Sequence, residues 1–419
     1  MRAWYKNLDV LSLVLWAILV VVGLAAIYST THAPASEFLL DSVRQNFNRQ
    51  LMWFGVSVVG VVIALLLPIR FYQQAAFPIY GLTILLLIAA LLFGREINGA
   101  KSWLIIGSFQ FQVSELAKVG TVLGVAQLIG LRRPKTMGIQ FALLLVGMIM
   151  LPATLIILQN DAGTALVFLG LIPIVLFWSG LDFSLLLLMV SPVIAGYLSI
   201  VYAPGAWAFA ILFTAFMWFK TRDRKYAFAS GLFTGGTVAI SWIAITSILQ
   251  PHHVARILSF TNPGADEFRR NAGFHQVQSM AAIGSGATWG KGFMQGTQTQ
   301  GAYVPEQSTD FVFSVIGEEF GFIGSLFVMI VFLMLLLRLL LLGSRMKHPF
   351  GVMAVAGTIG IYLIHIFINV GMATAILPVI GIPLPFISYG GTALLANSAL
   401  LAIVLALYFH RDDFSIYGY

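Results

Sequence analysis

The chain has 419 residues, of which 59% are hydrophobic and 9% charged, and its mean hydropathy is +0.93. Such a composition excludes a soluble globular domain, and repeated continuous apolar runs of about 18 or more residues are typical of transmembrane helices. Continuous runs also exclude a transmembrane β-barrel, whose strands alternate. The net charge of +7 is spread over short loops, so nucleic acid is not an expected partner. The sequence therefore predicts an all-α polytopic membrane protein.

Two features of the chain limit its chemistry and its processing. It contains no cysteine, which excludes disulfides, thiol catalysis and cysteine metal sites. Near the start, Arg2 and Lys6 precede an apolar run from Val10 to Ile27, as in a cleaved signal peptide. This run is long enough to span a membrane, so a retained signal-anchor helix is the favoured interpretation.

The chain divides into about twelve apolar spans by the length rule. They lie near residues 10–28, 51–67, 77–93, 114–130, 139–158, 164–180, 183–202, 206–219, 227–249, 311–341, 351–372 and 392–409. Lys and Arg are frequent in alternate connections, and the positive-inside rule then places both termini in the cytoplasm. In this frame residues 250–310 form one large loop outside.

The end of that loop places a carboxylate where polar sequence meets hydrocarbon. Asp310 closes the polar run and is followed directly by Phe311, Val312 and Phe313. Partial desolvation raises the pKa of a carboxylate and makes it a better proton acceptor. An aspartate before a helix is also a common N-cap, and on spacing alone that interpretation is favoured.

Other ionisable groups also fall in the outer half of the predicted membrane topology. Glu115 and Lys118 are three residues apart on one helix face, where they form either a functional pair or a structural ion pair. Asp161 belongs to a tight polar turn that needs Asn, Asp and Gly in any case.

Two segments combine glycine or proline with polar groups. The run from Gly284 to Gly292 contains Lys291 and resembles an anion site, although it is not a Walker A motif. The segment 376–392 has three prolines, which predicts a non-helical hairpin at the membrane interface. Ser388 in this hairpin either binds a headgroup or caps the next helix.

Deeper positions also carry polar side chains. Glu318 and Glu319 lie about two turns beyond Asp310 and need partners, for which Lys118 is a candidate. His365 and Asn369 share a helix face, and a hydrogen-bonded interhelical role is favoured over a proton relay.

Five motifs in this order resemble the SEDS family (shape, elongation, division and sporulation proteins) of the RodA and FtsW type. They are Ser114–Lys118, Gln159–Thr164, Ala282–Gly286, Pro305–Phe311 and the stretch from Asn369 to Thr392. The stretch from Gly290 to Gln300 is more similar to RodA than to FtsW. The chain departs from the family where Val113 and Asn160 stand in place of proline. Family members usually have about ten spans, so the resemblance also implies an extra helix pair within residues 181–249.

The resemblance implies a peptidoglycan glycosyltransferase that polymerises lipid II into β-1,4 glycan strands during cell elongation. The expected location is the bacterial cytoplasmic membrane. Expected partners are lipid II, a class B penicillin-binding protein that cross-links the product, and other membrane proteins of the elongation machinery. An FtsW-like septal polymerase remains an alternative. A lipid II flippase or ion-coupled transporter and a non-catalytic scaffold remain alternatives from other classes.

On this interpretation Asp310 is the general base for the attacking 4-hydroxyl group. Lys118, Arg256 and Lys291 are candidates for binding the pyrophosphate, and a divalent cation, Mg²⁺ or Mn²⁺, is expected to share that charge. Glu115 would orient Lys118. Asp161, Glu306 and Ser388 are further substrate-binding candidates. No organic cofactor is expected, and no metal ligand can be assigned from the sequence.

Overall fold

Long apolar helices dominate the computed structural model, which describes residues 8–32, 41–97, 99–107, 109–132, 138–248 and 273–411. Eleven helices in these ranges are long and apolar enough to cross a membrane. They are α1 (Val10–Thr31), α3 (Asn46–Leu66), α4 (Ile69–Phe93), α5 (Val113–Arg132), α6 (Ile139–Leu158), α8 (Phe183–Val201), α9 (Ala203–Thr221), α10 (Arg224–Ile243, continued by a π turn at Ala244–Ile248), α15 (Val312–Ser344), α16 (Pro349–Ala373) and α17 (Gly391–Phe409). A shorter apolar helix, α7 (Ala162–Trp178), completes the predicted set of about twelve.

Most helix boundaries follow the apolar runs closely, although α3 and α4 begin five and eight residues before the predicted spans 51–67 and 77–93. The predicted spans 139–158 and 183–202 differ from α6 and α8 by at most one residue. The run predicted as short, 206–219, is the 19-residue helix α9, because Ala203 and Pro204 at its start and Lys220 and Thr221 at its end also join the helix. The prediction of a helical polytopic membrane protein is confirmed, with one small sheet in addition to the helices.

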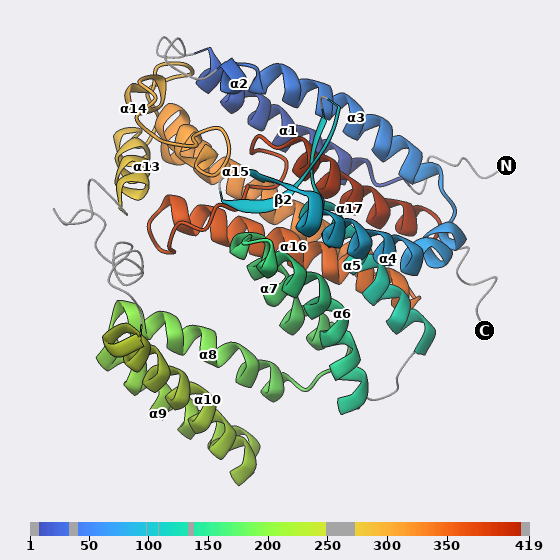
Figure 1. Ribbon diagram of the computed structural model, residues 1–419, viewed down its shortest axis with the longest axis vertical. Coiled ribbons are helices and arrows are strands. Elements are labelled where there is room, and N and C mark those ends of the chain that lie inside the picture. The colour runs from blue at the N-terminus through green and yellow to red at the C-terminus, as the bar shows by residue number, and fades with distance from the viewer. Residues whose placement is uncertain are drawn as a thin grey trace.

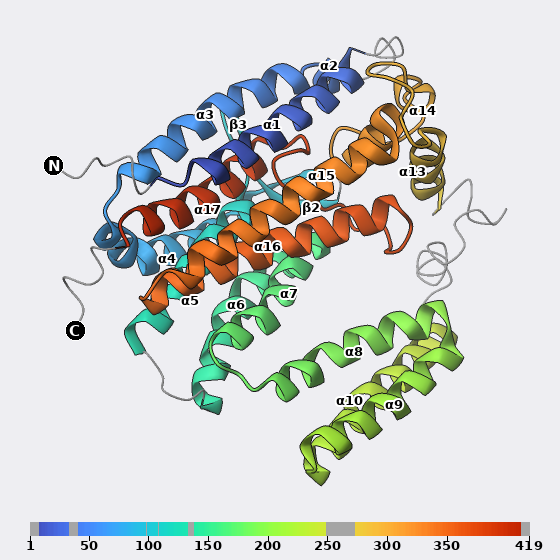
Figure 2. The same ribbon diagram turned by 180° about the vertical axis from the view of Figure 1, so that it is seen from behind.

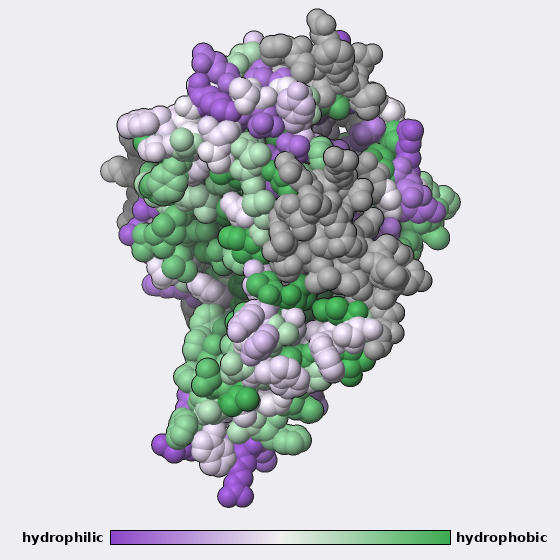
Figure 3. Space-filling view, turned by 90° about the vertical axis from the view of Figure 1, so that its left-hand side faces the viewer, coloured by the Kyte–Doolittle hydropathy of each residue, from purple (hydrophilic) through white to green (hydrophobic). Residues whose placement is uncertain are grey.

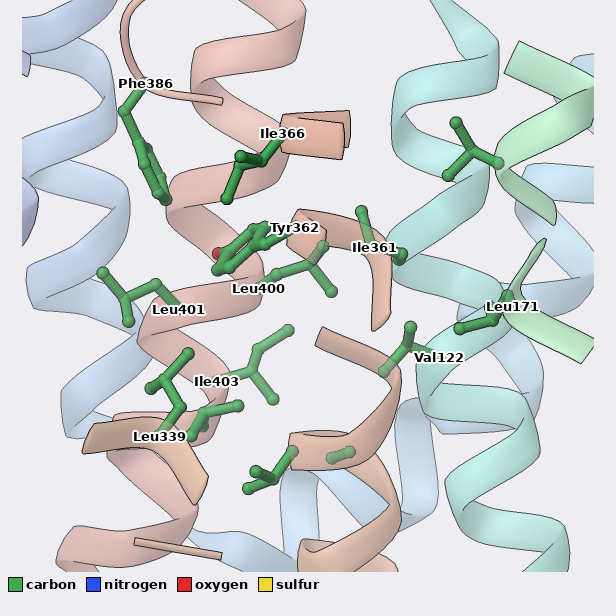
Figure 4. Close-up of a cluster of buried hydrophobic side chains, with 14 of the residues drawn as sticks. Val122, Leu171, Leu339, Ile361, Tyr362, Ile366, Phe386, Leu400, Leu401 and Ile403 are labelled. Carbon is green, nitrogen blue, oxygen red and sulfur yellow. The ribbon is translucent and has the colours of Figure 1, made fainter. Parts of the chain in front are cut away.

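The centre of the bundle is formed by α5, α16 and α17. In the most apolar 18-residue stretch of each of these helices, 78%, 72% and 83% of the residues are buried. Figures 1 and 2 show these helices enclosed by α1, α3, α4, α7 and α15. Their side chains form one apolar cluster with α7 and α15. In this cluster Leu400 and Ile366 lie beside Tyr362, and Val122 and Leu171 continue it toward α7 (Figure 4). The Tyr362 hydroxyl donates to the Asn397 carbonyl at 2.6 Å, so the one polar atom of this ring is satisfied.

A three-stranded antiparallel sheet lies between α4 and α5. Its strands are β1 (Arg95–Ile97), β2 (Ala100–Ile106) and β3 (Phe109–Gln112), in the order β1-β2-β3. The sheet was not predicted, although the alternation in Phe109–Gln112 is the period-two signal of a strand. Backbone N–H of Lys101 donates to the Gln159 carbonyl at 2.9 Å, which attaches the sheet to the turn between α6 and α7. We call this end of the bundle the sheet end.

The opposite end of the bundle carries basic residues. Asp9, which caps α1, is ion-paired with Arg338 near the end of α15. Arg345 donates to the Tyr408 hydroxyl at 3.4 Å, near the end of α17. The first and last long helices therefore begin and end at the same end of the molecule, as an even number of crossings requires.

Helices α8, α9 and α10 form a group of their own (Figures 1 and 2). They pack on one another around a small separate core of Ala195, Ala206, Ala210 and Val238. The Tyr197 hydroxyl bonds the Ile376 carbonyl at 3.0 Å, and α8 also contacts α7. This group occupies the region 181–249, in which the extra helix pair stays a prediction.

The surface of the molecule matches a membrane environment. On the face in Figure 3, apolar residues cover much of the described surface, while hydrophilic residues gather chiefly at its upper and lower ends. Exposed large apolar side chains are frequent on the outer helices, with Leu66, Phe93 and Phe228 more than 70% exposed. Such exposure is costly in water and is expected in contact with lipid.

Part of the predicted 250–310 loop packs as two short helices on α15. These are α13 (Phe274–Ser285) and α14 (Thr297–Gln300), whereas residues 249–272 lie outside the described residues. Gly290 and Gly321, both with positive φ, face each other: a Cβ on Gly321 would come within 2.3 Å of the Gly290 nitrogen. The glycines of this run therefore allow the loop backbone to lie directly against α15.

The buried carboxylate of Glu318 connects this segment to α15. It accepts hydrogen bonds from the Lys291 ammonium at 2.7 Å and from the backbone N–H groups of residues 297, 298 and 299 at 2.8 to 2.9 Å. Glu319 beside it bonds Ser29 and Gln300. Lys118 was the predicted candidate partner for these carboxylates, but the residues bonded to them are these loop and α1 residues.

We expect Glu318→Ala to destabilise the protein by about 2–4 kcal/mol, because it leaves the backbone N–H groups of residues 297, 298 and 299 without their acceptor and removes the anionic partner of Lys291. The measurement is the melting temperature of the purified protein in detergent. Glu96→Gln, which removes a carboxylate that is exposed on the sheet, is the control and is expected to melt like the wild type. Equal melting temperatures for both variants would contradict this role of Glu318.

Candidate active site

A cavity of about 620 Å³ opens at the sheet end, where five segments of the chain meet. Its walls come from the sheet, the α6–α7 turn, the segment before α15, the loop between α16 and α17, and the start of α17. Half of the lining residues have polar side chains: Ser102, Gln110, Gln112, Asn160, Asp161, Thr164, Glu306, Thr309, Asp310, Tyr389 and Thr392. Trp103 also lines the cavity. Three of the five sequence motifs, Gln159–Thr164, Pro305–Phe311 and the stretch from Asn369 to Thr392, thus contribute residues to one space.

Asp310 lies at one side of this cavity, two residues before the membrane span that begins at Val312. Its backbone carbonyl accepts a hydrogen bond of 2.9 Å from the Asn369 amide. Desolvation by burial, and secondly the negative charge of Glu306, raise the pKa of Asp310 to about 7. The structure gives this side chain no capping bond to the start of α15, whose N-cap residue is Phe311. Asp310 can therefore exchange a proton near neutral pH.

The loop between α16 and α17 is non-helical, as predicted, and lies against Asp310. Gly381 has φ +78°, and a Cβ at that position would lie 3.2 Å from Asp310 Oδ2. The Asn369 amide also donates to the Ile382 carbonyl at 2.8 Å. Asn369 therefore fixes the loop and Asp310 relative to each other, and any side chain at residue 381 would crowd the carboxylate.

Ser388 has a structural place in this loop. Its hydroxyl donates to the Thr309 carbonyl at 2.6 Å and accepts from the Leu384 N–H at 2.8 Å. Ser388 is buried and does not line the cavity, so its hydroxyl holds the residue next to Asp310. Substrate binding by Ser388 stays a prediction.

Glu115, Lys118 and His365 form a cluster in which each residue is 1% exposed. Lys118 Nζ lies 2.8 Å from Glu115 Oε1 and 2.9 Å from His365 Nε2. Because an ammonium only donates, His365 Nε2 accepts, and its Nδ1–H then donates to the Pro383 carbonyl at 2.9 Å. The cluster does not line the cavity. It supports the loop beside Asp310 through the bond from His365 to the Pro383 carbonyl.

Asp161 lines the cavity and is also a helix cap. It precedes α7 and accepts from the Thr164 N–H and hydroxyl, both at 3.0 Å. The Gln112 amide donates to the same carboxylate at 3.2 Å, which connects β3 to α7. Asp161 therefore both stabilises the polar turn before α7 and contributes a carboxylate to the cavity.

Glu306 is exposed at the cavity edge, and its backbone shapes the turn that leads to Asp310. Its carbonyl accepts from the N–H groups of Thr309 and Phe311 at 3.2 and 3.1 Å. Its carboxylate accepts from the Thr309 hydroxyl at 2.9 Å. The side chain therefore stays near Asp310, where its charge raises that pKa.

Two of the three predicted pyrophosphate ligands, Lys118 and Lys291, are not at the cavity surface. Lys118 is buried, Lys291 is paired with Glu318, and Arg256 lies outside the described residues. Among the described residues that line the cavity none is Lys, Arg or His, whereas three are carboxylates. The described residues also hold no group of three His, Asp or Glu side chains arranged for a metal ion.

Sequence comparisons assign the chain to a family. The model for the FtsW, RodA and SpoVE family, described as cell cycle protein, matches residues 9–222 and 204–413. The chain belongs to this family. Peptidoglycan glycosyltransferase RodA of Treponema pallidum is 32% identical, over 95% of this chain and 98% of the relative. Peptidoglycan glycosyltransferase MrdB of Escherichia coli K12 is also 32% identical, over 88% of this chain and 86% of the relative.

Solved structures of the same family have a similar fold. A chain from a peptidoglycan synthase complex, studied for its coordination of polymerization and crosslinking, aligns with a TM-score of 0.71 and 26% identity. The alignment covers 98% of this chain and 99% of that one. The rod shape determining protein RodA of Thermus thermophilus aligns with a TM-score of 0.63 and 25% identity, over 97% and 98% of the two chains.

We expect Glu115→Gln to destabilise the protein by about 3–5 kcal/mol, since it leaves the Lys118 ammonium buried without its anionic partner. The double variant Glu115→Gln, Lys118→Met removes the charge as well and is expected to recover much of the loss. Melting temperatures of the two variants and the wild type measure this difference. A double variant that melts below the single one would contradict a buried ion pair.

Proposed function

We propose that the protein polymerises lipid II into β-1,4 glycan strands, and that the cavity beside Asp310 is where the bond forms. The chain is a peptidoglycan glycosyltransferase of the RodA type, in line with relatives of that name at 32% identity over most of its length. The observation that carries the mechanism is the desolvated carboxylate of Asp310, with a pKa of about 7, in an open polar cavity. A general base works best when its pKa is near the working pH.

The reaction joins the 4-hydroxyl group of one lipid II sugar to the anomeric carbon of another. Asp310 accepts the hydroxyl proton as the new C–O bond forms, and the bond from the anomeric carbon to the pyrophosphate oxygen breaks. Attack from the face opposite the leaving group inverts the α-linkage to β, without a covalent enzyme intermediate. Glu306 raises the basicity of Asp310, and Asn369 and Gly381 fix its position.

The leaving pyrophosphate requires positive charge from outside the described cavity lining. Mg²⁺ is commonly bound by one or two carboxylates together with substrate phosphates, and it does not need a dedicated protein cage. Glu306, exposed at the cavity edge, suits such a shared site and is the residue we propose for it. When bound, the ion would neutralise charge on the pyrophosphate. Arg256 stays a further candidate.

The sidedness of the protein follows from the distribution of its basic residues. Arg338 and Arg345 lie at the end opposite the cavity, and Lys and Arg favour the cytoplasmic side. We therefore propose that both termini are cytoplasmic and that the cavity faces the outside of the bacterial membrane. Lipid II would reach it from the outer leaflet.

A cross-linking partner is part of the proposal. The similar solved chain comes from a complex that coordinates polymerization with crosslinking. A class B penicillin-binding protein and other elongation proteins are the partners we propose. Relatives named FtsW are 27–29% identical, below the 32% of the RodA and MrdB relatives, so elongation is favoured over septation.

We expect Asp310→Asn to lower the rate of glycan polymerisation by a factor of about 10²–10⁴, because an amide cannot accept the proton. The measurement uses purified protein with its penicillin-binding partner, lipid II and a divalent cation, and follows glycan strand formation. Asp182→Asn, at the helix cap between α7 and α8, is the control. Wild-type rates from the folded Asp310→Asn protein would refute the proposed base.

The rate should also depend on pH through this group. Asp310 acts as a base only when it is deprotonated, so kcat/KM should rise with pH up to about 7 and then level off. Glu306→Gln removes the neighbouring negative charge and should shift this rise to lower pH. Rate profiles of wild type and variant measure the shift. A profile that moves to higher pH, or does not move, would exclude Glu306 as the neighbour that raises the pKa.

A further inference from the structure

One face of the sheet forms a wall of the cavity. Trp103 pairs with Gln112 across β2 and β3, and Ile105 pairs with Gln110. Residues directly opposite each other in a sheet share a face, so these four side chains lie on one side. Trp103, Gln110 and Gln112 line the cavity, whereas Ile105 does not. On the other face Phe111 packs edge-on against Trp53, with 5.7 Å between ring centroids.

The sheet is held firmly against the rest of the site. The Gln112 N–H donates to the Thr392 hydroxyl at 3.3 Å, and its side chain donates to Asp161 at 3.2 Å. The Asn160 amide donates to the Gly99 carbonyl at 2.8 Å, at the turn between β1 and β2. These bonds come from α17 and the α6–α7 turn. The wall therefore has a fixed distance to Asp310, as a pre-formed binding surface requires.

The charges of the cavity select the kind of ligand that fits beside this wall. Asp161, Glu306 and Asp310 supply negative charge, and the described lining supplies no lysine, arginine or histidine. A pyrophosphate directly against this wall would meet carboxylates without a cationic side chain in the described lining to compensate them. A sugar ring carries hydroxyl and acetamido groups without charge, and amide side chains offer both donors and acceptors to such groups. An aromatic ring adds an apolar face for the C–H side of the sugar.

We propose that Trp103, Gln110 and Gln112 form a saccharide subsite for the N-acetylated sugar that carries the attacking hydroxyl group. This inference rests on the proposed function, because it identifies which part of lipid II the cavity holds. A base must lie within hydrogen-bond reach of the proton that it removes. Asp310 and the sheet wall line the same cavity, so the sugar against the wall is the one that Asp310 deprotonates. The pyrophosphates lie outside this wall.

The first test is direct binding, which does not depend on catalysis. The probe is the N-acetylated disaccharide of lipid II without lipid and pyrophosphate, added to the purified full-length protein in detergent. Trp103→Ala is expected to weaken binding about tenfold, and Gln110→Ala about threefold. Trp103→Phe, which keeps an aromatic face, should retain most of the affinity.

Ile105→Ala is the matched control, because it lies on the same sheet face outside the cavity and should bind like the wild type. Melting temperatures identify a variant that is unfolded. If Trp103→Ala is unfolded, the affinities of Gln110→Ala and Trp103→Phe are compared with that of the wild type instead. Inorganic pyrophosphate, used as an inhibitor of polymerisation, tests binding of the charged part of the substrate. Its inhibition constant should not change in Trp103→Ala or Gln110→Ala.

Two results would overturn the subsite. One is disaccharide binding that is absent from the wild type or equal in wild type, Trp103→Ala and Gln110→Ala. The other is loss of pyrophosphate inhibition in these variants with disaccharide affinity kept. Either result leaves the polymerase function intact if the wild type still forms glycan strands. Disaccharide binding that depends on Trp103, in a protein that forms no strands, would instead keep the subsite and contradict the proposed function.

Discussion

The geometry of the site depends on the hydrogen bonds that a buried, non-helical segment of backbone requires. The loop between α16 and α17 buries Ile382, Leu384 and Phe386, and its carbonyl groups at residues 382 and 383 lack the backbone N–H donors that a helix would supply. Side chains from α16 are the donors instead, since Asn369 bonds the Ile382 carbonyl and His365 bonds the Pro383 carbonyl. Because Asn369 also bonds the Asp310 carbonyl, the bonds that stabilise the loop also set the position of the base.

This arrangement explains why residues remote in sequence belong to one site. Lys118 is connected to the loop by His365, and Glu115 is connected to His365 by Lys118. A change in that buried cluster would move Pro383 and its neighbours, and Gly381 would no longer fit against the Asp310 carboxylate. Close packing transmits such shifts because interiors have little free volume. The cluster thus influences the chemistry without lining the cavity.

The sequence predicts the helices better than the site. Long apolar runs define α6 and α8 to within one residue, because hydrocarbon thickness fixes their length. The sheet was not predicted because β1 and β2 contain Arg95, Lys101 and Ser102 and lack a long apolar pattern. Its clearest signal was the alternation in β3. Asp310 was found from its place at a polar boundary, but Gly381 and Asn369 act on it through contacts between segments 59 and 71 residues apart, which no local pattern encodes.

The lysines show most clearly what a sequence leaves open. A lysine near an expected pyrophosphate suggests a ligand, yet Lys118 and Lys291 each have a buried carboxylate, Glu115 and Glu318, within 2.8 Å. Lys118 is 1% exposed, so removing it from Glu115 would leave a buried charge unpaired at a cost of several kcal/mol. Lys291 is partly exposed, but it is bonded to the hydroxyl groups of Ser285 and Thr297 as well as to Glu318. The charge of each lysine is therefore better suited to holding helices and loops together than to binding a ligand that must also leave. The cavity is left acidic and rich in amides, and this favours the uncharged sugar over the charged end of the substrate.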